Sequence, residues 1–508
     1  MDGLLLLPVF LPSLAGIFLL LSSFFEHVKI SRQSGADERQ PDEKGRRRIH
    51  LFTGIVLLVS AAAALWAAWG GAGSITLFWL MDNIPISFCV DEVGSLFVTV
   101  VSIVWVLVGF YSFVYMEHEG REKRFFGLYL LVYGILVALD FAGNLVTLYF
   151  FYEMMTLASM PMVLHNRSRE AIMAALKYLF YSMCGAYLGL FGIFFLYRYC
   201  DSLTFTAGGT LNTAAALGHQ GILLAAVFCM LIGFGAKAGM FPLHAWLPSA
   251  HPVAPSPASA VLSGIIVKSG VLAVIRVVYY IVGPGFLRGT WVQTAWMTLA
   301  LMTVFMGSLL AFREPVLKKR LAYSTVSQVS YILFGLSLLS PDGLTGALLH
   351  TVFHAFIKSA LFLTAGIFIF QCGKTRVEEL TGIGRQMPKT MMCYTFASLA
   401  LIGIPPASGF ISKWYLAQGA LGADVGVFGW LGPVVLLVSA LLTAGYLLPL
   451  TMQGFFPGEK FEQNTAEKQE PPMGMLLVLI VLAALSVLPG IFPDPLISCI
   501  SRIAEILM

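Results

Sequence analysis

The stretch GFGAKAGMFPLHAWLPSAHPVAPSPASAVLSGIIVKSG, residues 233–270, decides the fold class of this chain. It is apolar at both ends, but Pro242 and Pro248 interrupt it, and proline cannot continue the hydrogen-bond ladder of an α-helix. We therefore expect a broken helix, with Lys237 and His244 on either side of the break. Within a membrane, backbone freed in this way is tolerated where protein covers it or where it lines a wet cavity.

A second stretch, LIGIPPASGFISKWYL at residues 401–416, predicts another broken helix, because Pro405, Pro406 and Gly409 precede Lys413. Two interrupted helices in corresponding positions of two halves indicate an inverted repeat around sites at the membrane midplane. The alternative is that both are proline kinks that serve only packing.

The composition places both stretches in a membrane. Of the 508 residues, 58% are hydrophobic and 11% are charged, whereas about a quarter of a soluble protein is charged. Apolar runs of about 20 residues, each long enough to cross the hydrocarbon core, recur along the chain. They predict an all-α polytopic membrane protein of about 14 helices, at 3–25, 51–70, 93–115, 127–142, 144–164, 172–197, 220–248, 257–282, 292–311, 321–339, 344–371, 391–418, 429–456 and 473–492.

Loop charges predict the orientation. If the N-terminus lies outside, nearly all loop Lys and Arg residues fall on the cytoplasmic side, as the positive-inside rule requires. The outer side then keeps only Arg198, Arg288 and Arg502. We expect a multi-pass protein of the cell membrane with both termini outside, whose first apolar run is a membrane helix and not a cleaved signal peptide. The charged loop 26–50 is predicted to be a solvated insertion or a contact with a neighbour.

Several ionisable residues fall inside the predicted helices. A charge in a bilayer costs at least a few kcal/mol, so such residues are functional candidates. Lys177 and Arg276 lie near helix ends, and the alternative for them is a side chain that reaches the headgroups. Only one carboxylate is deeply flanked by apolar sequence, and an ion pair between it and a lysine would let one charge control the other's protonation. The candidates are Glu153, Lys177, Lys237, Lys268, Arg276, Lys358 and Lys413.

Histidines join this set in LLHTVFHAFIKSALFLTAG, where His350, His354 and Lys358 are spaced at i, i+4 and i+8. They should stack along one helix face over about 12 Å. Histidines, and lysines withdrawn from water, can exchange protons near neutral pH, so with intervening water the series makes a plausible proton wire. The alternative is two histidines that are hydrogen-bonded between helices.

Other kinds of chemistry find little support. The seven cysteines are isolated, and without CxxC or Cys/His spacing they suggest neither a zinc site nor an Fe–S cluster. There is no HExxH motif, and Gly373-Lys374-Thr375 lacks the preceding glycine of a phosphate-binding loop. The basic residues are scattered, so nucleic acid is not an expected partner. We expect no catalytic site, metal or cofactor in this chain.

At these residues the chain resembles the antiporter-like subunits shared by respiratory complex I, Mrp-type sodium/proton antiporters and membrane-bound energy-converting hydrogenases. The resemblance runs from about residue 90 to 450. It is carried by YFFYEMM (149–155), KAGMFPLHAWLPSAHPVAPSPASA (237–260), RLAYSTVSQVSYI (320–332), HTVFHAFIKSALFLTAG (350–366) and PPASGFISKW (405–414).

The resemblance implies two inverted five-helix repeats, at 127–282 and 292–456, between an N-terminal region (1–126) and a C-terminal helix with its tail (473–508). It also implies site roles. Glu153 and Lys237 would form a gating ion pair with Lys177 as a further basic partner. Lys268, His350 and His354 would be central relay groups, and Lys413 would be the exit lysine.

The resemblance further implies a proton-translocating subunit of a redox-driven complex. Its partners would be other membrane subunits and hydrophilic subunits that carry Fe–S clusters or other redox centres. The alternative is a sodium/proton antiporter subunit of an Mrp-type complex. Sodium prefers several oxygen ligands and one deep carboxylate supplies few, which favours protons, although neighbouring subunits can supply more oxygens.

Overall fold

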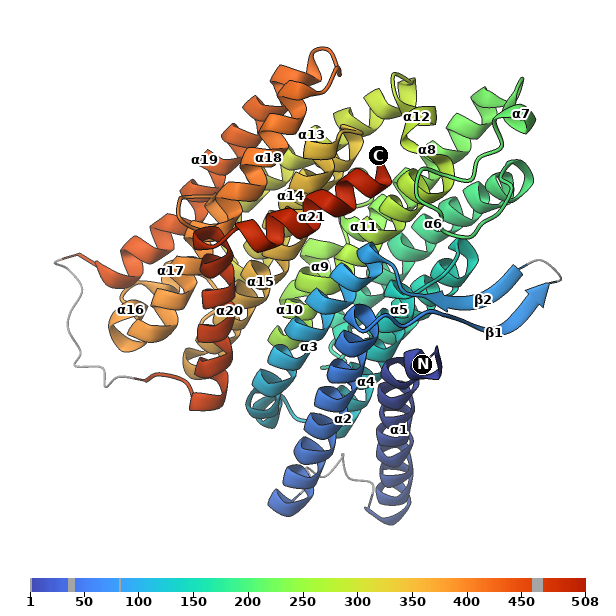
Figure 1. Cartoon of the computed structure of the whole chain (residues 1–508). Coiled ribbons are helices and arrows are strands. Elements are labelled where there is room, and N and C mark those ends of the chain that lie inside the picture. The colour runs from blue at the N-terminus through green and yellow to red at the C-terminus, as the bar shows by residue number, and fades with distance from the viewer. Residues whose placement is uncertain (1, 35–41, 82–83, 459–468) are drawn as a thin grey trace.

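The computed structural model describes residues 2–34, 42–81, 84–458 and 469–508. It is mostly helical, as predicted, and its long helices pack side by side in one bundle (Figure 1). The long helices are α1 (Leu7–Ser34), α2 (Glu43–Trp69), α3 (Glu92–Glu119), α4 (Glu122–Asp140), α5 (Leu145–Val163), α6 (Arg169–Tyr199), α8 (Gln220–Ala238), α13 (Trp291–Arg313), α14 (Leu317–Ser337), α15 (Pro341–Cys372), α17 (Pro388–Ile402), α18 (Ser408–Gly422), α19 (Phe428–Phe455), α20 (Met473–Ile491) and α21 (Asp494–Leu507).

Shorter elements connect them. These are α7 (Thr213–Ala216), α9 (Leu247–Val253), α10 (Ser256–Val261), α11 (Val267–Ile275), α12 (Pro284–Leu287), α16 (Ile383–Gln386), the 3-10 turns η1 (Asp2–Leu6) and η4 (Val377–Leu380), the π-helical turns η2 (Leu262–Ile266) and η3 (Arg276–Val282), and the strands β1 (Ser74–Met81) and β2 (Ile84–Cys89).

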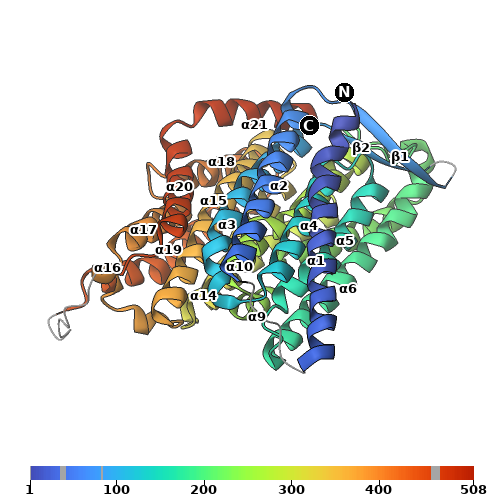
Figure 2. The same cartoon turned by 90° about the horizontal axis from the view of Figure 1, so that it is seen from below.

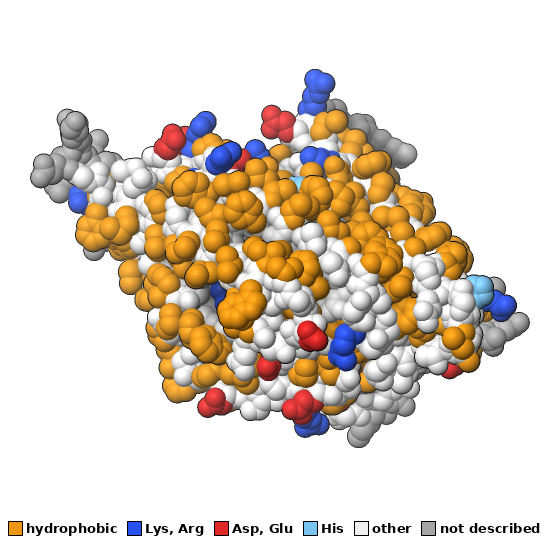
Figure 3. Space-filling view, turned by 90° about the horizontal axis from the view of Figure 1, so that it is seen from above, with side chains coloured by type: hydrophobic (Ala, Val, Ile, Leu, Met, Phe, Trp, Pro, Cys, Tyr) orange, Lys and Arg blue, Asp and Glu red, His pale blue; other side chains and the backbone are white. Residues whose placement is uncertain are grey.

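The helices make a multi-pass membrane protein. Within the described residues, ten helical stretches are long and apolar enough to cross a bilayer. Figure 3 shows a face covered by hydrophobic side chains, with charged side chains mainly along two opposite edges, as a membrane belt requires. The expected total of about 14 crossings and the two inverted repeats stay predictions.

One end of the bundle carries both chain termini, the amphipathic helix α21 and the β1–β2 hairpin (Figure 2). We call this end the terminal face. Helix α21 lies across it and buries Ile500, Ile503, Ala504 and Leu507. Apolar residues at this spacing form one helix face, so α21 packs along the ends of the other helices instead of crossing the membrane.

A continuous helical run at residues 256–282 forms the centre of the bundle. It consists of α10, η2, α11 and η3, and its membrane window is completely buried. Lys268 lies two residues after the end of the π-helical turn η2. Such turns interrupt the regular backbone bonding of a helix and are frequent at functional sites.

Both predicted helix breaks are confirmed, but His244 lies within the first break, between α8 and α9, and not beyond it. Helix α8 ends at Gly239, whose φ of +80° favours glycine, and α9 begins only at Leu247. Helix α17 ends at Gly403, with φ +90°, and α18 begins at Ser408. Each break therefore leaves a short non-helical segment, at 239–246 and 403–407, that is partly exposed on the surface of this chain.

A close crossing of α6 and α8 positions the first break. A Cβ atom added to Gly185 would lie 2.4 Å from the carbonyl oxygen of Gly233, and one added to Gly233 would lie 2.3 Å from the carbonyl oxygen of Gly185. Only glycine permits this approach, which is the usual way in which membrane helices pack closely.

Two expectations need correction. The chain is not all-α, because β1 and β2 form an antiparallel hairpin in which Ser74 pairs with Cys89. The loop predicted at 26–50 is largely helical, since α1 continues to Ser34 and α2 begins at Glu43; residues 35–41 lie outside the described residues. The stretch is also not simply solvated: Nε of Arg46 and Nε2 of His50 each lie 2.8 Å from an oxygen of Glu122 on α4.

Candidate functional site

Lys237 lies in the last turn of α8 and is completely buried. Its Nζ donates a hydrogen bond of 2.5 Å to Oγ1 of Thr156 on α5 and one of 3.3 Å to the hydroxyl of Tyr178 on α6. The same atom lies 5.2 Å and 5.0 Å from the ring centroids of Tyr152 and Tyr178. Hydroxyls and aromatic faces therefore hold this ammonium, and no carboxylate in the described part of the chain touches it.

Glu153 lies one turn before Thr156 on α5, but it does not pair directly with Lys237. No oxygen of Glu153 comes within 4.0 Å of Lys237 Nζ, so the expected ion pair is not formed as a contact. One carboxylate oxygen, Oε1, is buried without a hydrogen-bond partner, and the side chain as a whole is only partly buried. Glu153 therefore acts on Lys237 through its charge and not through a contact.

Lys177 and His244 lie near the first break. Nζ of Lys177, on α6, donates a hydrogen bond of 3.0 Å to Oγ of Ser249 on α9. His244 lies in the segment between α8 and α9, where its ring stacks on Phe241 and its Nδ1 is buried without a partner. Lys177 therefore ties α6 to the broken helix.

Lys268 sits on the central helical run and is 4% exposed. Its Nζ donates to the carbonyl oxygen of Ser263 at 2.9 Å and lies 2.6 Å from Nδ1 of His354 on α15. When Lys268 is an ammonium it can only donate, so His354 Nδ1 then accepts and the proton of that imidazole is on Nε2. The pair is set to pass a proton from the lysine to Nδ1 while Nε2 releases one on the far side.

His350 continues this line on the same helix. Its ring centroid lies 5.9 Å from that of His354, and its Nδ1 lies 2.9 Å from Oγ of Ser412 on α18. The Nε2 atoms of both histidines are buried without a partner. Each of these atoms is therefore available for a hydrogen bond with water.

Lys413 lies beyond the second break, next to Ser412. Its Nζ donates hydrogen bonds of 2.7 Å to the carbonyl oxygens of Leu401 and Ile402, at the end of α17. These carbonyls lack helical partners because α17 stops there, and the negative end of a helix favours a cation. The ring of Tyr331 lies 5.3 Å from Lys413 Nζ and stacks on His350 at 5.5 Å, which joins the two groups.

Lys358 is completely buried, but it points to a different neighbour. Its Nζ donates a hydrogen bond of 3.1 Å to the carbonyl oxygen of Leu321 on α14. The structure thus brings Lys268, His354, His350 and Lys413 together and leaves Lys358 beside them. Lys237 touches the central run through Gly270, where an added Cβ would lie 3.2 Å from Lys237 Cβ; among the described residues no hydrogen bond joins Lys237 to Lys268.

Three polar groups that sequence reasoning did not single out belong to the same interior. His251 on α9 is completely buried, stacks on Phe362 at 4.6 Å, and has no partner for either ring nitrogen. Lys318 on α14 donates to the carbonyl oxygen of Ala254 at 2.5 Å. Asp140 ends α4 and has a buried, unpartnered Oδ2. His251 lies in the proline-rich stretch of the broken helix, so the sequence could have marked it as an ionisable residue inside the membrane. Lys318 and Asp140 lie at helix ends, where charged residues are common and do not indicate a site.

Arg276 does not reach the headgroups but forms a buried ion pair. It is 1% exposed, and its Nη1 and Nη2 lie 2.5 Å and 2.7 Å from the two carboxylate oxygens of Asp91. Burial alone would raise the pKa of Asp91, but the charge and hydrogen bonds of Arg276 outweigh it and hold that pKa below its usual value. Asp91 also caps α3 by accepting from the backbone nitrogen of Gly94.

Comparison with known proteins agrees with this architecture. Residues 142–456 match the model described as NADH:quinone oxidoreductase/Mrp antiporter, transmembrane, and residues 79–126 match the N-terminus of chain 5 of NADH-ubiquinone oxidoreductase (complex I). NADH-quinone oxidoreductase subunit N of Desulforudis audaxviator is 33% identical over 78% of this chain and 82% of that protein. A Na(+)/H(+) antiporter subunit of Alkalihalophilus pseudofirmus is 27% identical over 99% of this chain and 97% of that protein. Hydrogenase-4 component B of Escherichia coli is 33% identical, and the matched region spans 82% of this chain but only 64% of that longer protein.

Solved structures show the same fold. The membrane-bound sulfane sulfur reductase, an archaeal respiratory membrane complex, contains a chain with a TM-score of 0.83 and 22% identity, covering 100% of this chain and 98% of that one. A chain of respiratory complex I from Thermus thermophilus gives a TM-score of 0.76 at 23% identity, covering 99% and 100%.

The fold, the buried lysines and these matches define an antiporter-like membrane subunit of a complex I-like assembly. The chain belongs to the NADH:quinone oxidoreductase/Mrp antiporter family.

Proposed function

We propose that this chain carries protons across the cell membrane as one subunit of a redox-driven complex, and that the terminal face is the outer side. The observation that supports this most is the buried line of exchangeable groups: Lys268 to His354 at 2.6 Å, His350 to Ser412 at 2.9 Å, and Lys413 beyond it. Buried ionisable groups are costly in a membrane, and several in one line are typical of a proton path.

The two broken helices place the ends of this line. Lys237 is in the last turn before the first break and Lys413 follows the second, as expected for two inverted repeats that face each other across the membrane midplane. In this proposal the repeats cover 127–282 and 292–456, and the chain crosses the membrane about 14 times.

The drive in this proposal is electrostatic. A redox step in a partner subunit changes the charge beside Glu153, whose Oε1 has no hydrogen-bond partner among the described residues. The altered charge on Glu153 changes the proton affinity of Lys237, which only neutral groups contact. A proton then passes by Lys268, His354, His350 and water to Lys413. The Fe–S clusters or other redox centres belong to the hydrophilic partner subunits.

A second candidate is a sodium/proton antiporter subunit, which the match to the Na(+)/H(+) antiporter protein of Alkalihalophilus pseudofirmus over 99% of this chain favours. Here the partnerless Oε1 of Glu153 would supply one oxygen of a sodium site, with the others from a neighbouring subunit.

The test is ion pumping by the parent complex in liposomes, with wild type and Glu153→Gln in sodium-free buffer. Protons moved by this chain predict acidification without sodium, and a loss of at least about tenfold in its rate in Glu153→Gln, because the amide cannot carry the gating charge. The matched control is Glu378→Gln, which changes an exposed carboxylate in η4. Pumping that requires sodium and that a protonophore enhances contradicts the proposal and assigns the sodium/proton function.

A further inference from the structure

Asp140 carries a buried carboxylate that the line from Lys237 to Lys413 does not use. It is 2% exposed, it is the last residue of α4, and its Oδ2 has no hydrogen-bond partner. A polar group buried without a partner costs free energy, and more so when it is charged. No basic nitrogen among the described residues lies within 4.0 Å of it, so Asp140 is not a member of a structural ion pair.

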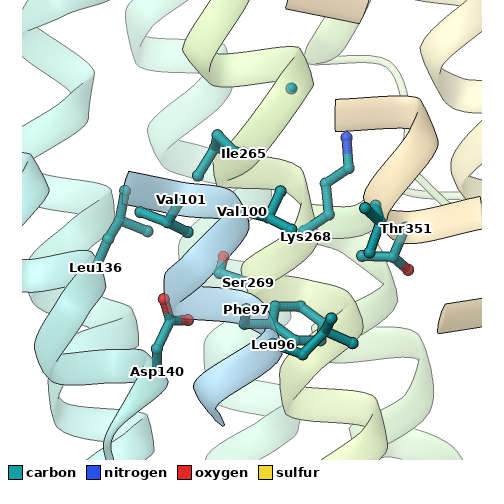
Figure 4. Close-up of a pocket in the computed structure, with 12 residues that line it drawn as sticks. Leu96, Phe97, Val100, Val101, Leu136, Asp140, Ile265, Lys268, Ser269 and Thr351 are labelled. Carbon is teal, nitrogen blue, oxygen red and sulfur yellow. The ribbon is translucent and has the colours of Figure 1, made fainter. Parts of the chain in front are cut away.

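A small cavity joins Asp140 to Lys268. Its volume is about 20 Å³, enough for one water molecule. Most of the lining is apolar and comes from α3, α4 and the central run, and the polar lining side chains are Asp140, Lys268, Ser269 and Thr351. Figure 4 shows that the ammonium of Lys268 points away from Asp140. The lysine stem is flexible, so the ammonium can also swing toward the cavity.

The other side of Asp140 leads to the terminal face. A Cβ atom added to Gly94 would lie 2.6 Å from the carbonyl oxygen of Asp140, 2.8 Å from Oδ1 of Asp91 and 3.4 Å from Nη2 of Arg276, so these three residues meet around Gly94. The Nε atom of Arg276 is buried without a partner. The side chain of Asp91 is 21% exposed and therefore reaches solvent.

A counter-charge role for Asp140 does not explain this placement. Arg276 already has a bidentate carboxylate partner in Asp91, so it does not need Asp140 as an ion-pair partner. Opposing influences act on the Asp140 carboxyl group instead: apolar burial favours the neutral acid and the positive charge of Arg276 favours the carboxylate. Burial is the larger of the two influences, so Asp140 readily accepts a proton, and the positive charge of Arg276 assists its release.

We propose that Asp140 is the proton acceptor of a second outlet, which leads from Lys268 through the cavity to the terminal face beside Asp91. The proposal rests on the proton-translocating function above. The Lys268 ammonium gives one proton to the cavity water, and that water gives one to Oδ2 of Asp140, which becomes the neutral acid. Asp140 then releases this proton to water near Asp91 and returns to the carboxylate. Lys268, now neutral, is reprotonated from the Lys237 side.

The orientation of the Lys268 side chain selects the outlet. With its ammonium against His354 Nδ1, as in this structure, the proton continues toward Lys413. With its ammonium turned into the cavity, the proton goes to Asp140. The two outlets therefore share Lys268 and separate after it.

The test measures protons pumped per electron by the parent complex in liposomes, which does not depend on how much complex assembles. Lys268→Met sets the level without this chain's contribution. Asp140→Asn keeps the shape of the side chain. We expect it to lower the ratio of protons to electrons from the wild-type value by at least half of the difference between wild type and Lys268→Met. Val100→Leu adds one methylene to the cavity wall without touching the carboxylate, and it should also lower the ratio of protons to electrons. Asp424→Asn, at an exposed carboxylate between α18 and α19, is the matched control and should keep the wild-type ratio.

The outcomes separate the outlet from the function. If Lys268→Met lowers the ratio and Asp140→Asn keeps the wild-type value, the outlet is wrong and the main line stands. If the wild-type complex moves no protons, both proposals fall. If Val100→Leu keeps the wild-type ratio while Asp140→Asn lowers it, the proton does not pass through the cavity, and the proposed route is overturned.

Discussion

We expect Lys237→Met to lower proton pumping by the assembled complex at least about tenfold, which corresponds to 1.4 kcal/mol, without any loss of thermal stability. The ammonium is completely buried and has only hydroxyls and ring faces around it. Such a charge costs several kcal/mol to bury and gains little in return. Methionine fills similar space without that cost, so the variant should unfold at the same or a higher temperature.

The combination of these two results is what identifies Lys237 as functional. Pumping is measured in liposomes and unfolding by the intrinsic fluorescence of the purified complex. Lys389→Met is the matched control, because Lys389 is an exposed lysine at the start of α17, and it should change neither property. If Lys237→Met lowers the unfolding temperature and leaves pumping intact, the lysine serves packing and the account of it is wrong.

The largest expected effect on stability is at Arg276. Arg276→Met should lower the free energy of unfolding by about 3 kcal/mol, at the low end of the range for a broken buried pair, since Asp91 is partly exposed. The methionine leaves the Asp91 carboxylate with the hydroxyl of Tyr280 and its helix cap but without a cation. The measurement is denaturant or thermal unfolding of the purified complex.

A double variant separates the lost pair from lost packing. Asp91→Asn in the Arg276→Met background removes the unpaired charge and keeps a good cap, so it should recover part of the lost free energy of unfolding.

The stabilisation by the Arg276–Asp91 pair also depends on pH. Because the folded pKa of Asp91 lies below its usual 3.8, the stabilisation is present at neutral pH and is lost only as the pH falls through that lowered value. Full stability of Arg276→Met at pH 7 contradicts the structural role of the pair.

Sequence patterns predicted the helix breaks well, because the cause is local. Pro242 and Pro405 remove backbone donors wherever they occur, and glycines with positive φ end the helices before them at Gly239 and Gly403. The i, i+4 spacing likewise placed His350 and His354 on one face, since it depends only on helix geometry.

What depended on packing between distant segments was predicted less well. The position of Glu153 in the sequence does not show whether its side chain points at Lys237. In the structure Lys237 contacts Thr156, which lies one helical turn after Glu153 on α5. Arg276 looked equally able to reach the headgroups, because its partner Asp91 is 185 residues away. The β1–β2 hairpin was hidden in a connection between apolar helices, although SITLFWLM and IPISFC are rich in β-branched and aromatic residues.

The most direct test of the central claim is the number of protons pumped per electron by the complex with Lys268→Met, because every proposed route passes through this residue. Lys319→Met, a half-exposed lysine on α14 paired with Glu314, serves as the control. The account predicts that Lys268→Met lowers the ratio by the whole share of this subunit while Lys319→Met keeps the wild-type value. A wild-type ratio in Lys268→Met would contradict the account, since protons would then cross without the buried line.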